Sequence, residues 1–236
     1  MSSNWLKRRM ELEQWMGADV IFRGHHEEPE EGEPVVDELD EKLAAIEKEV
    51  ENCTKCDLHK TRTQGVFAKG KSDAEVMMIG EAPGADEDEQ GLPFVGRAGK
   101  LLDQIILAMG FGVDDIYITN ILKSRPPENR DPKKEEIKAC WPYLEEQIQL
   151  IQPEVIITLG KPAANTLLDR NSSMGDMQGR WFSYEGIPVM STYHPAYLLR
   201  APSQKEKVWE DLKKVVSALH GEDDPLGGVG EAGLGF

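Results

Sequence analysis

The sequence has no long apolar run and contains few cysteine and basic residues. None of its hydrophobic runs approaches the roughly 18 residues that a membrane-spanning helix needs. The N-terminal residues MSSNWLKRRMELEQW have no apolar centre of the kind found in signal peptides, so we expect a cytoplasmic protein. Only 3 of the 236 residues are cysteine, which argues against a disulfide framework. Two of them form a CxxC motif, which is more typical of metal binding or redox chemistry.

Basic residues are outnumbered by acidic ones, 27 to 43, and the net charge of -16 argues at first against a nucleic-acid partner. The acidic excess is uneven along the chain. Residues 1–52 hold 6 basic and 15 acidic side chains, whereas residues 53–219 hold 21 and 24. The central part is therefore nearly neutral, and a basic face can form there.

Hydrophobic residues make up 39% of the chain, which is enough for a core. Four short apolar runs predict core strands, at residues 74–79, 115–122, 155–159 and 187–192. The last of these pairs with residues 180–184 across a turn at Glu185 and Gly186. Helical spacing of apolar residues is found at 37–52, 101–109, 135–151, 161–168 and 205–220. This alternation predicts an α/β fold with a parallel sheet covered by helices on both faces.

The two ends of the chain differ in composition from its centre. Residues 1–40 combine a helical pattern at 5–16 with an acidic linker, and residues 221–236 form a Gly-rich tail. We expect both ends to be flexible, because they offer little to bury. Residues 41–220 are then expected to form the functional domain.

Residues 79–102, IGEAPGADEDEQGLPFVGRAGKLL, join the first core strand to the next helix. Open α/β sheets place their ligand sites in such loops, and the five glycines of this one allow close approach of the backbone to a ligand. A solvated connector is the alternative, although loops of this length are usually functional. A phosphate site is disfavoured, because no phosphate-binding glycine motif is present and the clustered carboxylates would repel phosphate.

Polar side chains follow three of the predicted strands, namely Glu81, Asn120 and His194. An asparagine can pair with the adjacent N–H and C=O groups of a uracil-like imide. A histidine can donate to a carbonyl oxygen on which negative charge develops, and Phe94 offers a flat face for stacking. Each residue has a structural alternative: a turn cap for Asn120, and core positions for His194 and Phe94. Together at one edge of the sheet they predict a pocket for a planar heterocycle.

Three motifs follow the CxxC motif in a fixed order: GEAPGADEDEQGLPFVGRAGKLL, YITNILKSRPPENR and YHPAYLLR. In this arrangement they resemble family 4 uracil-DNA glycosylases, the iron–sulfur group of bacteria and archaea, over about residues 53–219. The resemblance implies a three-layer α/β/α sandwich around a four-stranded parallel sheet. It also implies a monomeric hydrolase of base excision repair that flips uracil out of DNA and cleaves its N-glycosidic bond, leaving an abasic site.

The resemblance also assigns roles to individual residues. Catalytic roles fall to Glu81, Glu87, Asn120 and His194, with the choice of the carboxylate that activates water left open. The uracil-binding set is Gly80, Ala82, Phe94, Asn120 and His194. The segment that fills the gap in the duplex and grips its backbone is Leu198, Leu199 and Arg200. The N-terminal arm and the C-terminal tail are candidate contacts for a replication or repair partner.

The metal site departs from the family pattern. Relatives bind a [4Fe–4S] cluster through four cysteines, of which Cys53, Cys56 and Cys140 match positions in this chain, whereas Ser124 stands at the remaining one. Three interpretations stay open. Ser124 or a nearby group such as His59 completes the cluster; or the site holds a more labile or three-iron cluster; or it holds zinc or no metal.

Other functions are also compatible with parts of the sequence. A catalytically weak DNA-binding or lesion-sensing relative would keep the same motifs. The branch of the superfamily that couples covalently to DNA resembles GEQPG and has a basic, His-containing insertion, whereas this chain has Ala82 and the compact KSRPPENRDP. A redox protein using the CxxC motif would leave the predicted pocket unexplained.

Overall fold

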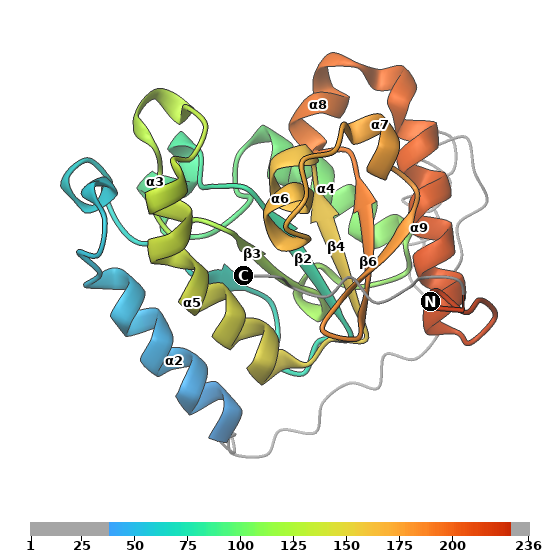
Figure 1. Ribbon diagram of the computed structural model, residues 1–236, viewed down its shortest axis with the longest axis horizontal. Helices are drawn as coiled ribbons and strands as arrows, with labels where there is room; N and C mark the ends of the chain where they lie inside the picture. The colour runs from blue at the N-terminus through green and yellow to red at the C-terminus, as the bar shows by residue number, and fades with distance from the viewer. Residues whose placement is uncertain (1–37, 228–236) are drawn as a thin grey trace, which may run out of the picture.

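The computed structural model describes residues 38–227, and a single six-stranded sheet forms its centre (Figure 1). The strand order is β1-β3-β2-β4-β6-β5. In chain order the strands are β1 (Ala68–Lys69), β2 (Val76–Gly80), β3 (Tyr117–Asn120), β4 (Val155–Leu159), β5 (Trp181–Tyr184) and β6 (Ile187–Thr192). The four central strands are parallel, which confirms the predicted class, and β1 and β5 add antiparallel edges.

Helices cover both faces of this sheet (Figure 1). One face carries α4 (Arg97–Ala108), α8 (Pro195–Arg200) and α9 (Lys205–Leu219). The other face carries α2 (Glu38–Glu51), α5 (Lys134–Ile151) and α6 (Lys161–Leu167). The shorter elements are α3 (Ala85–Gln90), α7 (Met174–Met177) and the 3₁₀ turns η1 (Asp57–Lys60), η2 (Val113–Asp115), η3 (Pro127–Asn129) and η4 (Pro202–Gln204).

Alternate residues of each central strand pack on opposite faces, as the two-residue period of a strand requires. In β2, Val76 and Met78 join the core beneath α4 and α9, whereas Met77 and Ile79 join the core beneath α2 and α5. Every residue of β2 is buried. The carboxyl ends of the parallel strands are therefore held in place by helices packed on both faces of the sheet.

Two helices lie in segments that the sequence analysis treated as loops. The long segment 79–102 contains α3. Its first turn holds three acidic residues, whose negative charges interact favourably with the positive N-terminal end of the helix dipole. Gly91 ends this helix in the left-handed conformation (φ 75°). The motif YHPAYLLR contains α8, with Pro195 in its first turn. The apolar pattern misses both helices because each is only six residues long.

Several predictions concern residues outside those the structure describes. The helical pattern at 5–16 and all but the last residues of the N-terminal arm lie there, as do residues 228–236 of the tail. The helix predicted at 37–52 is present as α2 and packs on α5. Among the helices of the described range, none is both long enough and apolar enough to cross a bilayer.

Candidate functional site

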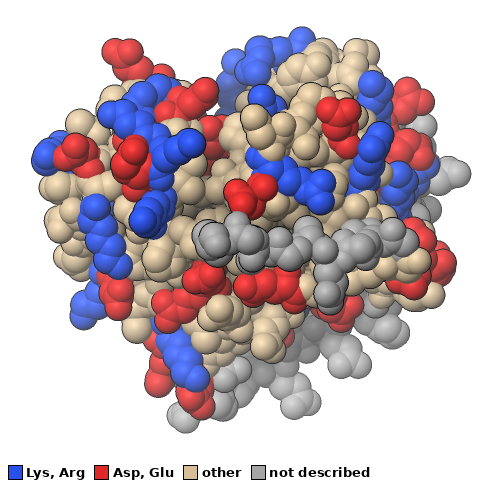
Figure 2. All heavy atoms as spheres, viewed as in Figure 1, with Lys and Arg blue, Asp and Glu red and all other residues tan. Residues whose placement is uncertain are grey.

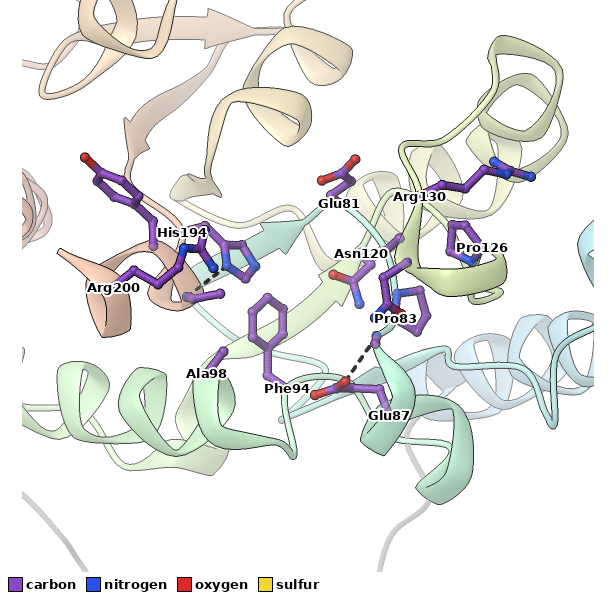
Figure 3. A pocket seen from close by; sticks show the side chains of 15 residues that line it. Glu81, Pro83, Glu87, Phe94, Ala98, Asn120, Pro126, Arg130, His194 and Arg200 are labelled. Atoms are coloured by element: carbon purple, nitrogen blue, oxygen red, sulfur yellow. Dashed lines mark hydrogen bonds between the residues drawn. The ribbon is translucent and has the colours of Figure 1, made fainter.

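A cavity of about 530 Å³ opens at the carboxyl ends of β2, β3 and β6 (Figure 3). Its walls come from the loop after β2, the end of β3, the η3 segment and α8. The lining residues are Glu81, Ala82, Pro83, Gly84, Glu87, Phe94, Ala98, Asn120, Pro126, Asn129, Arg130, His194, Ala196, Tyr197 and Arg200. The structure thus brings together Glu81, Asn120, His194 and Phe94, which the sequence analysis assigned to one pocket.

Asn120 is the last residue of β3 and lies deep in the cavity. Its side chain is buried, and its Oδ1 atom has no hydrogen-bond partner among the described residues. A buried polar atom without a partner is costly, so such an atom beside a cavity is a candidate ligand contact. Gly80, its neighbour across β2 and β3, makes room for this amide: a Cβ atom there would lie 2.3 Å from Oδ1.

Phe94 forms a second wall of the cavity, and its backbone is held in an unusual conformation. Its φ angle is 53°, which is uncommon for a residue with a bulky side chain. Lys69 Nζ donates to the Phe94 carbonyl oxygen at 3.0 Å, and Gly99 lies so close that a Cβ atom would come 1.9 Å from that oxygen. These contacts aim the ring at the space in front of Asn120, with its centroid 5.6 Å from that of His194.

His194 caps the N-terminus of α8, and the cap determines which ring nitrogen carries the proton. Nδ1 accepts a hydrogen bond from the backbone N–H of Ala196 at 3.1 Å. The proton of a neutral ring is therefore on Nε2, which remains as a donor for a ligand. Burial, and to a smaller extent the positive charge of Arg200, lowers the pKa of His194 to about 4. The side chain is accordingly a neutral donor at physiological pH.

The two carboxylates of the pocket differ in their surroundings. Burial raises the pKa of the half-buried Glu81 to about 7, and the nearby Asp131 adds to the shift. Glu87 is instead engaged by the backbone: Oε1 accepts from Val95 and Gly96, both at 3.0 Å, and Oε2 accepts from Gly84 at 3.1 Å. Glu81 is thus available for proton transfer, whereas Glu87 fixes the loop that carries Phe94.

Comparison with known proteins agrees with this geometry. The chain matches the model of the uracil DNA glycosylase superfamily over residues 67–213. It is 42% identical to a type-4 uracil-DNA glycosylase of Archaeoglobus fulgidus, with 78% of this chain and 96% of the relative covered. It is 43% identical to a type-4 uracil-DNA glycosylase of Saccharolobus solfataricus, over 81% of this chain and 94% of the relative. It is 39% identical to a type-4 uracil-DNA glycosylase of Thermotoga maritima, over 78% of this chain and 97% of the relative. This chain belongs to the uracil DNA glycosylase superfamily.

The third motif of this superfamily member, YHPAYLLR, presents its two leucines differently from the sequence-based assignment. Leu198 is fully buried in the core beneath α8. Leu199 is 40% exposed, and Arg200 lies at the edge of the cavity beside His194 (Figure 3). In this structure the helical turn directs Leu198 to the sheet, so Leu199 and Arg200 are the exposed members of the predicted DNA-contact segment.

Charges on the surface of this superfamily member are mixed. Figure 2 shows lysine and arginine side chains interspersed with acidic ones over the face seen in Figure 1, without one continuous basic area. Near the cavity, Arg200 is exposed, whereas Arg130 is paired with the buried Glu136 through two hydrogen bonds of 2.9 and 2.6 Å. Arg200 is therefore the freer of the two arginines that line the cavity.

Three cysteines and Ser124 stand at the predicted metal-ligand positions. Cys53 and Cys56 are half-buried, Cys140 is buried, and Cys56 and Cys140 contact the same small cluster around Leu58 and Leu122. Ser124 is also buried, and its Oγ accepts a hydrogen bond from Arg62 Nη1 at 2.8 Å. Within residues 38–227 no three His, Cys, Asp or Glu side chains are arranged to hold a metal ion. The donor set does not fit a cluster held by four thiolates.

Two lysines that support the pocket were missed by sequence reasoning. Lys69, on the short edge strand β1, holds the Phe94 carbonyl, and nothing in the sequence marks a two-residue strand.

Lys123 is only 1% exposed and donates to Thr119 Oγ1, the Asn120 carbonyl and Gln147 Oε1 at 2.6, 2.8 and 2.5 Å. Its place directly after the apolar residues Ile121 and Leu122 was a signal that could have indicated burial.

Proposed function

We propose that this protein is a uracil-DNA glycosylase, which hydrolyses the bond between uracil N1 and the deoxyribose C1′ carbon. The observation that carries the proposal is the buried, unpaired Oδ1 of Asn120, in a cavity that also offers an aromatic ring and a neutral imidazole donor. Uracil can donate its N3–H to this oxygen and accept at O4 from the Asn120 amide, while Phe94 stacks on the ring. Cytosine has no N3–H and carries an amino group instead of O4, so it would leave the buried amide unpaired.

The proposed reaction begins with the base outside the helix, because C1′ is inaccessible in a stacked duplex. The C1′–N1 bond breaks, and its electron pair leaves with uracil as the N1 anion. His194 Nε2–H donates to uracil O2, on which part of this charge develops, without transferring its proton. A neutral donor suits this role, because the low pKa of His194 keeps the ring in one protonation state throughout.

A water molecule then adds to the cationic sugar, and we propose Glu81 as the group that orients it and accepts its proton. A carboxyl group whose pKa is about 7 is a stronger base than an ordinary glutamate, and a substantial fraction of it is ionised at neutral pH. The products are free uracil and an abasic site. Glu87 is proposed as a positioning residue, because its carboxylate is occupied by three backbone N–H groups.

Contacts with DNA are proposed at the edge of the cavity. Leu199 is the exposed apolar side chain that can occupy the gap left by the flipped base, and Arg200 can contact a neighbouring phosphate. Gly80 and Ala82 remain part of the proposed uracil-binding set through their backbone positions beside Glu81. We assign this activity to residues 41–220 acting as a monomer.

The [4Fe–4S] cluster implied by the family would need a fourth ligand beside Cys53, Cys56 and Cys140. The fourth position carries Ser124, whose hydroxyl is already bound by Arg62. Thiolates are the usual ligands of iron–sulfur clusters, and a serine hydroxyl is protonated at neutral pH. No step of the proposed reaction passes through the cluster.

A single-turnover assay on an oligonucleotide with one uracil tests the proposal. We expect release of free uracil, with the rate reduced by about 100-fold or more in Asn120→Ala and in His194→Ala, because each variant loses a contact to the departing base. Asn52→Ala is the matched control, since Asn52 lies at the end of α2 and bonds only Lys48 there. Its rate should equal that of the unaltered protein.

The alternative function, a catalytically weak relative that senses lesions, predicts a different result in the same assay. Such a protein would bind uracil-containing DNA without releasing uracil. Binding without release, from protein with an unaltered circular dichroism spectrum, would favour this alternative. Equal rates for Asn120→Ala and the unaltered protein would overturn the assignment of the pocket itself.

A further inference from the structure

Arg62 connects the segment that carries the CxxC motif to the loop after β3. Its Nη1 donates to Ser124 Oγ at 2.8 Å, and its Nη2 donates to the carbonyl oxygens of Glu51 and Cys53 at 2.7 and 3.2 Å. The Glu51 carbonyl lies at the C-terminal end of α2, where a positive charge is favourable. One guanidinium therefore joins the end of α2, the CxxC motif and the segment that contains Ser124.

The residues that follow Arg62 are held by other parts of the protein. The backbone and hydroxyl of Thr63 donate to the buried Asp88 on α3 at 2.9 and 2.8 Å, and Gln64 donates to the Glu89 carbonyl at 2.6 Å. The backbone N–H of Val66 donates to the Lys123 carbonyl at 2.9 Å, next to Ser124. Hydrogen bonds within the protein thus fix this segment at four positions between Arg62 and Val66.

Ser124 is the residue that makes the contact with Arg62 possible. Its side chain is only 4% exposed, so its hydroxyl depends on a protein partner, and Arg62 Nη1 supplies that partner. A cysteine at this position would offer a weaker acceptor to the guanidinium, but a far better ligand to iron. Serine in place of cysteine at position 124 therefore favours the hydrogen bond from Arg62 over the binding of iron.

We infer that Arg62, through its hydrogen bonds to Ser124, Glu51 and Cys53, replaces an iron–sulfur cluster as the link between the CxxC segment and the loop after β3. The inference does not depend on the proposed reaction, because none of these residues lines the catalytic cavity. It predicts a domain that folds and remains stable with three free thiols.

Metal content and thermal stability test this inference directly. The unaltered protein, purified without oxygen, should contain less than about 0.1 iron or zinc per chain, against four irons for a complete cluster. Its melting temperature should stay the same after treatment with dithionite and EDTA. Stoichiometric iron, or a fall in melting temperature after this treatment, would overturn the inference.

Variants of Arg62 and Ser124 provide the second measurement. Arg62→Gln should lower the melting temperature by about 4 °C or more, since it removes a charged donor with three acceptors. Lys60→Gln removes the same charge from the same segment but loses only an exposed pair with Asp57, so it should shift the melting temperature by less than about 1 °C. Equal melting temperatures for Arg62→Gln and Lys60→Gln would contradict the proposed link.

Ser124→Cys restores the fourth thiol, so that iron can compete with Arg62 for the side chain at position 124. After reconstitution with ferrous iron and sulfide, we expect this variant to take up iron and to show iron–sulfur absorbance, whereas the unaltered protein takes up none under the same conditions. Equal iron uptake by both proteins would show that Ser124 does not prevent cluster binding, and it would overturn the inference.

Discussion

At the scale of single residues, Glu81 has a carboxyl group whose pKa is raised to about 7, chiefly by burial. If Glu81 accepts a proton from water, only its ionised form is active, and that form increases as pH rises through 7. We expect the single-turnover rate to rise by about tenfold per pH unit from pH 5 and to level off above pH 7. His194 should add no step near pH 6.5, because its pKa is about 4.

The variant Glu81→Gln should remove this pH dependence and leave a slow, flat profile. Its stability gives an independent check. The raised pKa means that folding favours the protonated carboxyl, so ionisation destabilises the fold increasingly between pH 4.5 and pH 7. Glu81→Gln should therefore melt a few degrees higher than the unaltered protein at pH 8 and no higher at pH 4. A rising rate profile that survives in Glu81→Gln would exclude Glu81 as the base.

Gly80 is a residue whose lack of a side chain shapes the pocket. In Gly80→Ala the new Cβ would lie 2.3 Å from Asn120 Oδ1 and 2.6 Å from Phe94 Cζ, so both uracil contacts must shift. We expect product inhibition by free uracil to weaken by about tenfold or more, which is the size of one lost hydrogen bond to a ligand. Gly175→Ala is the comparison, because a Cβ atom there would meet only Ser173 Oγ, at the ordinary contact distance of 3.7 Å. Unchanged uracil inhibition in Gly80→Ala would contradict this arrangement.

At the scale of secondary-structure elements, Lys123 connects β3 to α5 behind the pocket. Its Nζ atom bonds Thr119 and Asn120 at the end of β3 and Gln147 on α5. In Lys123→Met three buried acceptors each lose a hydrogen bond, among them the backbone carbonyl of Asn120. We expect the melting temperature to fall by about 4 to 8 °C and uracil inhibition to weaken.

Lys71→Met is a suitable control for this variant, because Lys71 is exposed and pairs only with surface carboxylates of Asp73 and Asp115. Its effect on stability should stay below about 1 kcal/mol. Uracil inhibition that is normal in Lys123→Met, despite a lower melting temperature, would show that Lys123 stabilises the fold without positioning Asn120.

At the scale of the whole molecule, a net charge of -16 must be reconciled with binding to DNA. We predict that Arg200, at the edge of the cavity, supplies one phosphate contact. In Arg200→Ala the slope of log affinity against log salt concentration should become shallower by about 0.9. Arg170→Ala, which removes a charge over the Phe182 ring of β5, should leave the slope unchanged. Equal slopes for Arg200→Ala and the unaltered protein would remove Arg200 from the DNA contact.

Much of the fold could be predicted from the sequence because its signals are local. The apolar runs at 74–79, 155–159 and 187–192 correspond to the buried strands β2, β4 and β6, since parallel strands covered on both faces must be apolar throughout. Helices as long as α5 and α9 also follow from spacing alone. Strand β1 and helices α3 and α8 were missed, because two to six residues are too few to show a period.

The candidate site was predictable only as a set of residue types at strand ends. Glu81, Asn120 and His194 follow apolar runs in the sequence, and parallel strands bring their carboxyl ends to one edge. Their chemical states depend on neighbours that are distant in the chain or set by a local cap. Burial raises the pKa of Glu81, the Ala196 N–H determines the His194 tautomer, and Lys123 holds the Asn120 backbone.

The sequence by itself therefore determined the order of the central strands and the longer helices, the edge where chemistry is placed and the family to which the chain belongs. Only the tertiary structure decided that Glu87 serves the loop, that Leu198 faces the core and that Ser124 is bonded to Arg62. The physical reason is that a side chain's orientation, burial and hydrogen-bond partners arise from packing between distant segments. Residue spacing carries no information about such contacts.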